Sequence, residues 1–385
     1  MLCPICACAS EAVFERPGQA GSVYLKTDHS MDLQVAGCRN CDFFWNVEAF
    51  ADPERFLGWM AQAYQSYQLL SDTLHGFPLV DPRAEMAENF LDRHCDWPKL
   101  RHVLEVGSNR GDFLAFLQSR HGHLQVLGLE SSALPRVGVP TLFGDAMQAN
   151  FSPSFDLVVA RQVLEHTPAP EGFLRHLGTF LSDEGLLFIE VPDLEIELAE
   201  GVDPFVIEHV GHYSVKALER LGDRAGLNLV AVDRRYQLGV LFRKGARKTP
   251  SVKADGRGRW ERLREFADNQ ARTADVWREL TLQGYGLCFY GASNVYLAVS
   301  GVLRQRWGAH WDACERALVD DFPQKHGERV GGLRVTSWEE HRPGEKTIYV
   351  VCAMYRYHRQ KMIPTVESRM GEHDKLFAMW TPLRA

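Results

Sequence analysis

The sequence has no apolar run that is long enough to cross a membrane. Its longest largely apolar stretches, GLLFIEV and TIYVVCAMY, have the length of strands, whereas a membrane-spanning helix needs about 20 such residues. The first ten residues, MLCPICACAS, lack the basic leader and the apolar centre of a secretory signal. We therefore expect a soluble protein of the cytoplasm with no membrane partner.

Positive charge is not in excess either. The 43 Lys and Arg residues stand against 50 Asp and Glu residues, which gives a formal net charge of -7 at pH 7. A general nucleic-acid-binding protein needs a basic face to neutralise phosphates, so the composition argues against nucleic acid as a partner. With 385 residues, of which 45% are hydrophobic, the chain is long enough for two or three globular domains.

Cysteine is sparse beyond the first fifty residues, which hold five of the nine cysteines. Cys3 and Cys6 form one C-x-x-C pair, and Cys38 and Cys41 form a second. Two such pairs can surround one Zn²⁺ ion with four sulfurs and leave no open position, so the spacing predicts a structural zinc ribbon. Reduced thiols without a metal are the alternative, since a reducing cytosol disfavours disulfides. Cys8 could replace Cys6 as a ligand or simply lie nearby.

A glycine-containing turn follows a strand-like run in the segment LEVGSNRGDFLAF, which begins at Leu104. Gly107 and Gly111 lie between this run and a helical pattern, and the next strand-like run, LQVLGLE, ends in Glu130. Strand, glycine turn, helix, strand and terminal acid form the first half of a nucleotide-binding α/β sheet. The glycines let a ligand approach the backbone, and the acid accepts hydrogen bonds from ribose hydroxyls.

The details of this turn argue against NAD as the ligand. Glu105 occupies the first glycine position of the dinucleotide pattern, and the spacing between Gly107 and Gly111 is one residue longer. The segment resembles the first motif of class I S-adenosylmethionine-dependent methyltransferases. The resemblance continues through LFGDAM, where Asp145 matches the acid that contacts the adenine amino group, and through the strands of FDLVVAR and GLLFIEV. A Rossmann-like fold without a cofactor is the alternative.

Histidines and an acid follow the predicted fourth and fifth strands. His166 lies in LEHTPAP, at the edge where open α/β sheets bind ligands, and either catalysis or shaping of the cofactor site would explain it. Glu208 and His209 precede a helix that Ser214 is expected to cap. An imidazole is well suited to proton abstraction near neutral pH, so His209 is our candidate base, with Glu208 beside it. Bracing of a loop is the alternative role for this pair.

The composition changes after about residue 245. A basic, turn-rich stretch leads into a long amphipathic helical pattern, WERLREFADNQARTADVWRELTLQG. A new strand, the turn Gly-Ala-Ser-Asn at 291–294 and a helix follow, with further strands in RALVDDF and TIYVVCAMY. These elements predict a second Rossmann-like unit. Its turn could bind an anion at the helix N-terminus, but ordinary turn chemistry explains one glycine equally well.

The order of these units resembles that of the sugar C-methyltransferases that act on nucleotide-linked deoxyketosugars. The Tyr-His-Glu-His segment of that family aligns with residues 206–209, so the resemblance implies the acid Glu208 and the base His209, whereas Val206 replaces the tyrosine. It also implies that Tyr64 and Tyr67, in AYQSYQLLSD, belong to a lid over the cofactor. The expected domains are a zinc-binding ribbon (1–55), a methyltransferase domain (56–245), and a helical connector with a C-terminal Rossmann-like domain (246–385).

We therefore expect an α/β enzyme that transfers a methyl group from S-adenosylmethionine to a small polar substrate. A nucleotide-linked sugar and a natural-product intermediate are the leading substrate classes, with His209 and Glu208 removing the proton. An O- or N-methyltransferase of another small metabolite is the alternative, which the missing tyrosine favours. A non-catalytic zinc-ribbon binding module is a third hypothesis, and the intact Gly107, Gly111 and Glu130 argue against it. The sequence does not predict the oligomeric state.

Overall fold

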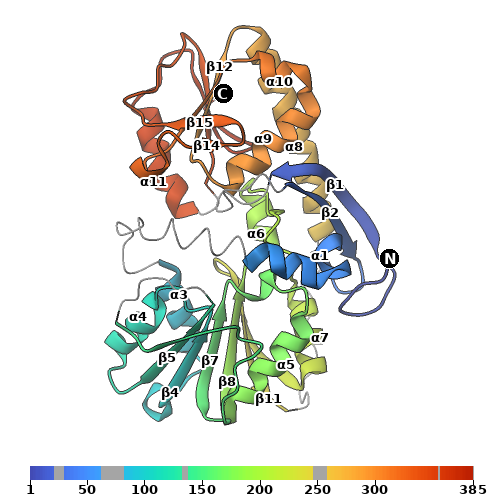
Figure 1. Cartoon of the computed structure of the whole chain (residues 1–385), viewed down its shortest axis with the longest axis vertical. Coiled ribbons are helices and arrows are strands. Elements are labelled where there is room, and N and C mark those ends of the chain that lie inside the picture. Colours follow the sequence, from blue (N-terminus) through green and yellow to red (C-terminus); the bar gives the residue numbers. More distant parts are fainter. Residues whose placement is uncertain (21–29, 62–81, 132–137, 246–257, 354–355, 385) are drawn as a thin grey trace. The chain divides into compact units, whose positions relative to one another are not determined.

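The computed structural model describes residues 1–20, 30–61, 82–131, 138–245, 258–353 and 356–384. The chain divides into two compact units that are each discontinuous in sequence (Figure 1). The first unit comprises Met1–Phe14, Gln34–Leu194 and Glu208–Gly256, and the second comprises Glu15–Leu33, Glu195–Ile207 and Arg257–Ala385. The division into three consecutive domains stays a prediction.

A seven-stranded sheet forms the centre of the first unit, in the order β10-β11-β8-β7-β4-β5-β6. The strands from β8 to β6 are parallel, and β11 runs antiparallel between β8 and β10. The glycine turn follows strand β4, as the sequence predicts, and β4 is the middle one of the five parallel strands. The strands are β4 (His102–Val106), β5 (Gln125–Glu130), β6 (Thr141–Phe143), β7 (Phe155–Arg161), β8 (Leu181–Val191), β10 (Leu227–Asp233) and β11 (Leu238–Lys244).

Helices cover both faces of this sheet (Figure 1). Successive strand residues point to opposite faces, so Val103 packs with α3 (Pro82–Leu91) and α4 (Asp112–Arg120), and Leu104 packs with α5 (Pro170–Phe180) and α7 (Val215–Ala225). The hydroxyl of Ser214 accepts a hydrogen bond from the Ala217 N–H at 2.9 Å, which confirms the predicted N-cap of α7. Gly226 ends that helix with a left-handed φ of 79°.

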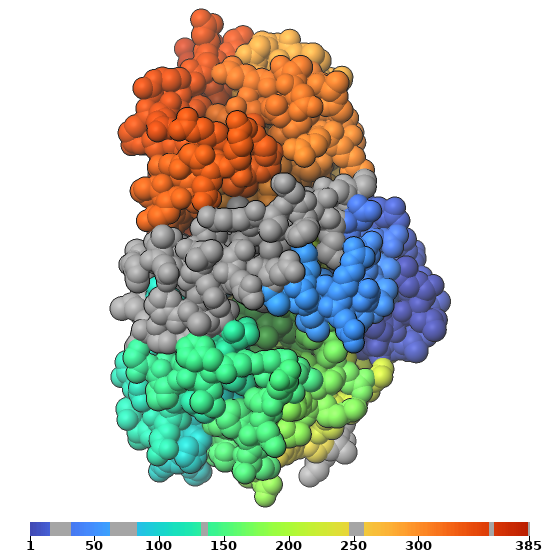
Figure 2. Space-filling model, in the orientation of Figure 1, coloured from blue at the N-terminus to red at the C-terminus, as the bar shows by residue number. Residues whose placement is uncertain are grey.

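A four-stranded sheet holds the cysteine-rich segment, in the order β1-β2-β3-β9. Strand β3 (Phe43–Asn46) pairs with β9 (Gly211–His212), which lies just after the candidate base in the sequence. Figure 2 shows the N-terminal segment, in blue, lying against the green surface of the first unit. The other elements here are β1 (Glu11–Ala20), β2 (Ser30–Cys38) and α1 (Val47–Ala51).

A second seven-stranded sheet forms the centre of the second unit, in the order β14-β15-β13-β12-β16-β17-β18. Its five inner strands are parallel, and both edge strands are antiparallel. The predicted second Rossmann-like unit is therefore confirmed. Its strands are β12 (Gly286–Tyr290), β13 (Arg316–Val319), β14 (Arg329–Val330), β15 (Leu333–Thr336), β16 (Thr347–Val351), β17 (Lys375–Ala378) and β18 (Thr381–Arg384).

The second sheet also has helices on both faces. Helix α11 packs against Tyr290 and Val351, and α9 places Tyr296 5.2 Å from the ring of Phe289, which points to the opposite face. In the part of the chain that the structure describes, no helix is both long and apolar enough to span a bilayer. The helices are α6 (Leu194–Ala199), α8 (Arg259–Leu282), α9 (Asn294–Trp307), α10 (Ala309–Ala313) and α11 (Arg356–Glu367).

Candidate functional site

Two glycines shape the turn between β4 and α4. Gly107 has φ +69°, and a Cβ atom there would lie 2.4 Å from Cγ2 of Val163. Gly111 has φ +89° and occupies the N-cap position of α4. Both positions have left-handed backbone conformations that side chains disfavour, and at Gly107 there is also no space for one. The turn therefore presents bare backbone at the carboxyl edge of the sheet, where open α/β folds bind ligands.

Glu130 lies next to this turn, as predicted. Its Oε2 accepts a hydrogen bond from the Asn109 N–H at 2.7 Å, and its Oε1 accepts one from the Ser131 hydroxyl at 3.3 Å. The Gly107 N–H donates to the carbonyl of Leu129 at 2.8 Å. The end of β5 and the turn after β4 thus form one hydrogen-bonded edge. Glu130 is only 8% exposed, so its carboxylate is held in a fixed position.

Asp145 lies two residues beyond β6, at the same edge. Its Oδ1 accepts a hydrogen bond from the Met147 N–H at 2.9 Å, which fixes a short turn and leaves the residue exposed. The side chains of Phe143 and Met147 are 57% and 43% exposed. A carboxylate with apolar side chains beside it offers both a polar and an apolar surface to a flat heterocycle. The sequence motif identified the acid but not these apolar neighbours.

Glu105 belongs to a row of charged residues on the face of the sheet that α3 and α4 cover. It is 4% exposed, and its Oε2 has no hydrogen-bond partner among the described residues. Arg161, at the end of β7, pairs through Nε with Glu190 of β8 at 3.2 Å and stacks on Phe113. Burial raises the pKa of Glu105 to about 8, although the positive charge of Arg161 opposes this rise. Sequence reasoning missed Arg161 and Glu190, whose positions at strand ends were the available signal.

Three side chains meet where the turn after β7 approaches the segment before α7. His166 ends the 3₁₀ helix η2 (Leu164–His166), and its ring lies 5.0 Å from that of His209. The side chains of Glu165, His166 and His209 bring their polar atoms within 4.8 Å of one another. The structure therefore brings both predicted histidines together. Glu165 was not predicted, although it precedes His166 directly.

Hydrogen bonding defines the state of this histidine pair. His166 Nδ1 donates to the carbonyl oxygen of Glu208 at 2.8 Å, so its Nε2 carries the lone pair. His209 Nδ1 has no hydrogen-bond partner among the described residues. Burial lowers the pKa of His166 to about 4, and it lowers the pKa of His209 well below the usual range, with His166 and His212 adding to the effect. Both imidazoles are therefore neutral near pH 7, and each ring carries one nitrogen lone pair.

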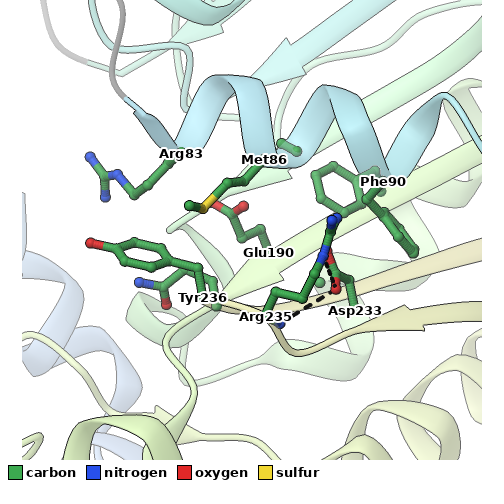
Figure 3. Close-up of a pocket in the computed structure, with 11 residues that line it drawn as sticks. Arg83, Met86, Phe90, Glu190, Asp233, Arg235 and Tyr236 are labelled. Atoms are coloured by element: carbon green, nitrogen blue, oxygen red, sulfur yellow. Dashed lines mark hydrogen bonds and ion pairs between the residues drawn. The ribbon is translucent and has the colours of Figure 1, made fainter. Parts of the chain in front are cut away.

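A pocket lies between α3 and the turn that joins β10 to β11. Figure 3 shows Met86 and Phe90 on the helix facing Glu190, Arg235 and Tyr236 on the sheet side. The Nε of Arg235 lies 2.9 Å from Asp233, and the pair lines the rim of the pocket. Apolar and charged side chains therefore face the same space beside the charged row. The pocket could not be predicted from the sequence, because its walls come from distant segments of the chain.

The four cysteines of the two C-x-x-C pairs converge. The sulfurs of Cys3 and Cys41 are 3.5 Å apart, those of Cys6 and Cys38 are 3.4 Å apart, and all four lie within 4.8 Å of one another. A disulfide needs about 2.05 Å, whereas four ligands about 2.3 Å from one zinc ion are spaced much as these sulfurs are. The hydrogen bond from Cys41 lowers the pKa of Cys3 to about 5. Cys8 lies outside the group, and its sulfur accepts a hydrogen bond from Asn40 at 2.9 Å.

The Gly-Ala-Ser-Asn turn of the second unit has partners within its own unit. A Cβ at Gly291, which has φ +105°, would lie 2.7 Å from the carbonyl oxygen of Cys352. The Ala292 N–H donates to Asp320 Oδ2 at 2.8 Å, and the amino group of Lys325 lies 3.0 Å from the same oxygen. Close packing of the turn therefore accounts for its glycine. The predicted lid residues, Tyr64 and Tyr67, lie outside the described residues.

The comparisons with known proteins agree with this geometry. A family model described as "Methyltransferase domain" matches residues 81–232. Residues 81–232 form a methyltransferase domain. This domain contains the glycine turn and the charged row.

Curated relatives of the chain include methyltransferases of several kinds. The C-methyltransferase NovU of Streptomyces niveus is 27% identical over 293 residues, which cover 66% of each chain. The (S)-tetrahydroprotoberberine N-methyltransferase of Eschscholzia californica is 20% identical over 123 residues, or 29% of this chain and 35% of that one. The chain thus spans just under two thirds of the length of the first and about a third of the second.

Among solved structures, the chain is similar to a 1,6-didemethyltoxoflavin-N1-methyltransferase of Burkholderia thailandensis. It is 17% identical, with a TM-score of 0.33, and the match covers 44% of this chain and 92% of that one.

Proposed function

We propose that this chain transfers the methyl group of S-adenosylmethionine to a small polar acceptor, and that the first acceptor to test is a nucleotide-linked ketosugar methylated on carbon. The observation that carries the proposal is the neutral, partly open pair His166 and His209 at the carboxyl edge of a methyltransferase sheet. The relation to NovU, a C-methyltransferase, favours carbon as the attacked atom.

The residues at the glycine turn fit this cofactor. Gly107 has a left-handed φ and carries no side chain, so the backbone of the turn stays bare, and Glu130 offers a fixed carboxylate to the ribose hydroxyls. Asp145 and its apolar neighbours would take the adenine ring. Glu105, a buried acid with an oxygen that lacks a partner, is suited to the positively charged methionine end. When bound, S-adenosylmethionine supplies a methyl group that its sulfonium centre already activates.

The chain must then align the acceptor and take up one proton. In our proposal, His209 would remove the proton from the carbon next to the acceptor's carbonyl. The resulting enolate would take the methyl group as the bond between methyl and sulfur breaks, with S-adenosylhomocysteine as the leaving group. His209 is neutral near pH 7 because burial lowers its pKa, so its lone pair is available. Glu208 contributes by holding His166 beside His209 through its carbonyl oxygen. General-base catalysis of this kind typically contributes about 10²- to 10⁴-fold.

The acceptor can be identified with labelled cofactor. Purified protein incubated with methyl-labelled S-adenosylmethionine and either candidate nucleotide-linked ketosugars or metabolite extracts should yield a labelled small molecule by mass spectrometry. In heavy water without the methyl donor, the acceptor's carbon-bound hydrogen should exchange, because proton removal precedes methyl transfer. If neither label transfer nor exchange occurs with any acceptor, the proposed function is wrong.

Methylation of nitrogen or oxygen is a second candidate, and one residue favours it. Val206 stands where the sugar C-methyltransferases have a tyrosine that helps to handle the ketosugar and its enolate. A buried valine cannot hydrogen-bond to an enolate oxygen. A heteroatom acceptor needs only removal of its proton, which His209 can provide. This alternative predicts an N- or O-methylated product and no hydrogen exchange at carbon.

We also propose that Cys3, Cys6, Cys38 and Cys41 hold one structural zinc ion. The convergence of four sulfurs supports this proposal, and so does the local sequence, in which each C-x-x-C pair forms a tight turn. All four positions of a tetrahedral ion would be filled, so the metal would have no open site for substrate.

A further inference from the structure

The chain that follows His209 is bonded on one side to the cysteine-rich segment. Strand β9 forms an antiparallel pair with β3. The Asn46 N–H donates to the carbonyl oxygen of Val210 at 2.9 Å. The hydroxyl of Ser214 donates to the carbonyl oxygen of Cys41 at 2.6 Å. The residues just after the proposed base are thus attached to a cysteine pair more than 160 residues away in the sequence.

The opposite side of the same segment is bonded to the turn η2 that carries His166. The Val210 N–H donates to the carbonyl oxygen of Glu165 at 2.7 Å. The hydroxyl of Tyr213 donates to the carbonyl oxygen of Leu164 at 3.2 Å, and its ring packs 5.0 Å from that of Phe43 in β3. Residues 210–214 therefore lie between strand β3 and the turn η2, with hydrogen bonds to both.

Ser214 is the link closest to the sulfur group. Its hydroxyl donates to the carbonyl of Cys41 and accepts from the Ala217 N–H, so it joins the cysteine turn to the start of α7. The cysteine turn is closed by a hydrogen bond from the Asp42 N–H to the carbonyl of Cys38 at 2.8 Å. Ligation of the Cys38 and Cys41 sulfurs would hold the carbonyl that Ser214 contacts in one place.

We propose that the Cys38–Cys41 turn and β3 are a positioning device for His209, and that Ser214 is its positioning residue. This inference rests on the proposed function, because it assigns the zinc ribbon a role in the methyl-transfer step. Displacement of a reacting group by about 1 Å can cost about 10²-fold in rate. The groups proposed for the cofactor, such as Gly107 and Glu130, make their hydrogen bonds elsewhere, at the ends of β4 and β5. Disturbing the ribbon should therefore slow catalysis without weakening cofactor binding.

The first test compares three variants at this link. Ser214→Ala loses both hydrogen bonds and should lower kcat by roughly 10- to 100-fold, with the dissociation constant for S-adenosylmethionine within about twofold of the wild type. Ser214→Thr keeps a hydroxyl and should restore most of kcat. Arg224→Ala is the matched control, because Arg224 also contacts the ribbon, at the carbonyl of Ile5, but from the last turn of α7. It should leave kcat nearly unchanged.

The second test does not depend on measuring methyl transfer. Elemental analysis should find about one zinc ion per chain, and a chelator should then remove it. Hydrogen-exchange mass spectrometry should show faster exchange of residues 210–214 in the metal-free protein, while residues 104–111 keep their protection. The control is the same protein after zinc is added back, which should restore slow exchange.

The outcomes separate this inference from the function on which it rests. The inference would be overturned if a folded Ser214→Ala variant had the same kcat as the wild type. It would also be overturned if this variant lost kcat and cofactor affinity equally. Unchanged exchange at 210–214 after zinc removal, or loss of protection throughout the first unit, would also overturn it. If Ser214→Ala does not fold, the exchange experiment on the wild-type chain decides the question. Failure of the proposed function is recognised differently, by the absence of any methyl transfer in the wild type.

Discussion

Glu105 is the most deeply buried acid of the proposed cofactor site. Its carboxyl group is buried, and Glu130, Glu190 and Asp112 add negative charge around it, so its pKa rises to about 8 despite the nearby Arg161. Its side chain is therefore mostly protonated at pH 7 in the free protein. A raised pKa means that its contribution to folding stability is fully present below the ordinary value near 4.5 and is lost as the pH rises through about 8.

A cationic ligand next to Glu105 would favour the ionised carboxylate over the protonated form. Because ionised Glu105 pairs better with the positive methionine end of the cofactor, we expect binding near pH 7 to release a proton. The affinity of the wild type for S-adenosylmethionine should rise between about pH 6 and pH 7.5, by up to about tenfold per pH unit. Calorimetry in two buffers of different ionisation enthalpy measures the proton released. Glu105→Gln should remove this component, and the same proton release in that variant would contradict the assignment.

Individual residues show which parts of the candidate site could be predicted from the sequence. Glu105, Gly107, Glu130 and Asp145 were predicted from one contiguous motif pattern, and they all lie at the carboxyl edge of the sheet. Glu165 was missed although it is adjacent to His166, because a motif names residue types but not which neighbours point to the same place. The link between Ser214 and Cys41 could not be predicted, since nothing in either local sequence indicates the other.

At the scale of elements, the shape of the turn between β4 and α4 is expected to affect both stability and cofactor binding. Gly107 and Gly226 both have a left-handed φ, +69° and +79°, so Ala at either position should cost about 1 to 2 kcal/mol of backbone strain. Only Gly107 faces a close neighbour, Val163. Gly107→Ala should therefore lose additional stability of about 1 to 3 kcal/mol through overpacking.

The two glycine variants should differ in function as well as in stability. Gly107→Ala should also bind S-adenosylmethionine more weakly because its turn must shift, whereas Gly226→Ala, at the end of α7, should bind normally. Denaturant unfolding and calorimetry measure the two effects. Equal stability losses, with unimpaired binding in Gly107→Ala, would show that the turn does not cradle the cofactor.

Elements with a clear periodicity were predictable from the sequence. Several inner strands of the two seven-stranded sheets (β4, β5, β7, β8, β12, β13 and β16), the long helix α8 and the Ser214 cap follow from apolar spacing and capping residues. Strand β9 was not predictable, because its two residues carry no alternation and its pairing with β3 depends on tertiary contacts. The pocket in Figure 3 was missed for a similar reason, since α3 and the β10–β11 turn meet only in the folded chain.

At the scale of the whole molecule, chain order and spatial grouping differ. The three consecutive domains stay a prediction, and within the first compact unit the structure groups the cysteine-rich residues of the first 14 positions with the methyltransferase domain. Residues 195–207, which directly precede Glu208, group with the second unit. Composition and local patterns identify where a unit begins along the chain, but they do not report which distant segments share one core.

The central claim is that His209 removes the proton of the acceptor in the proposed methyl transfer. The most direct measurement is single-turnover methyl transfer by His209→Asn, with the cofactor affinity measured alongside. We predict a fall in turnover of roughly 10²- to 10⁴-fold, with cofactor affinity and folding nearly unchanged. His102→Asn, an exposed position at the start of β4, is the control and should retain full turnover. Near-normal turnover in a stable His209→Asn protein would contradict the account.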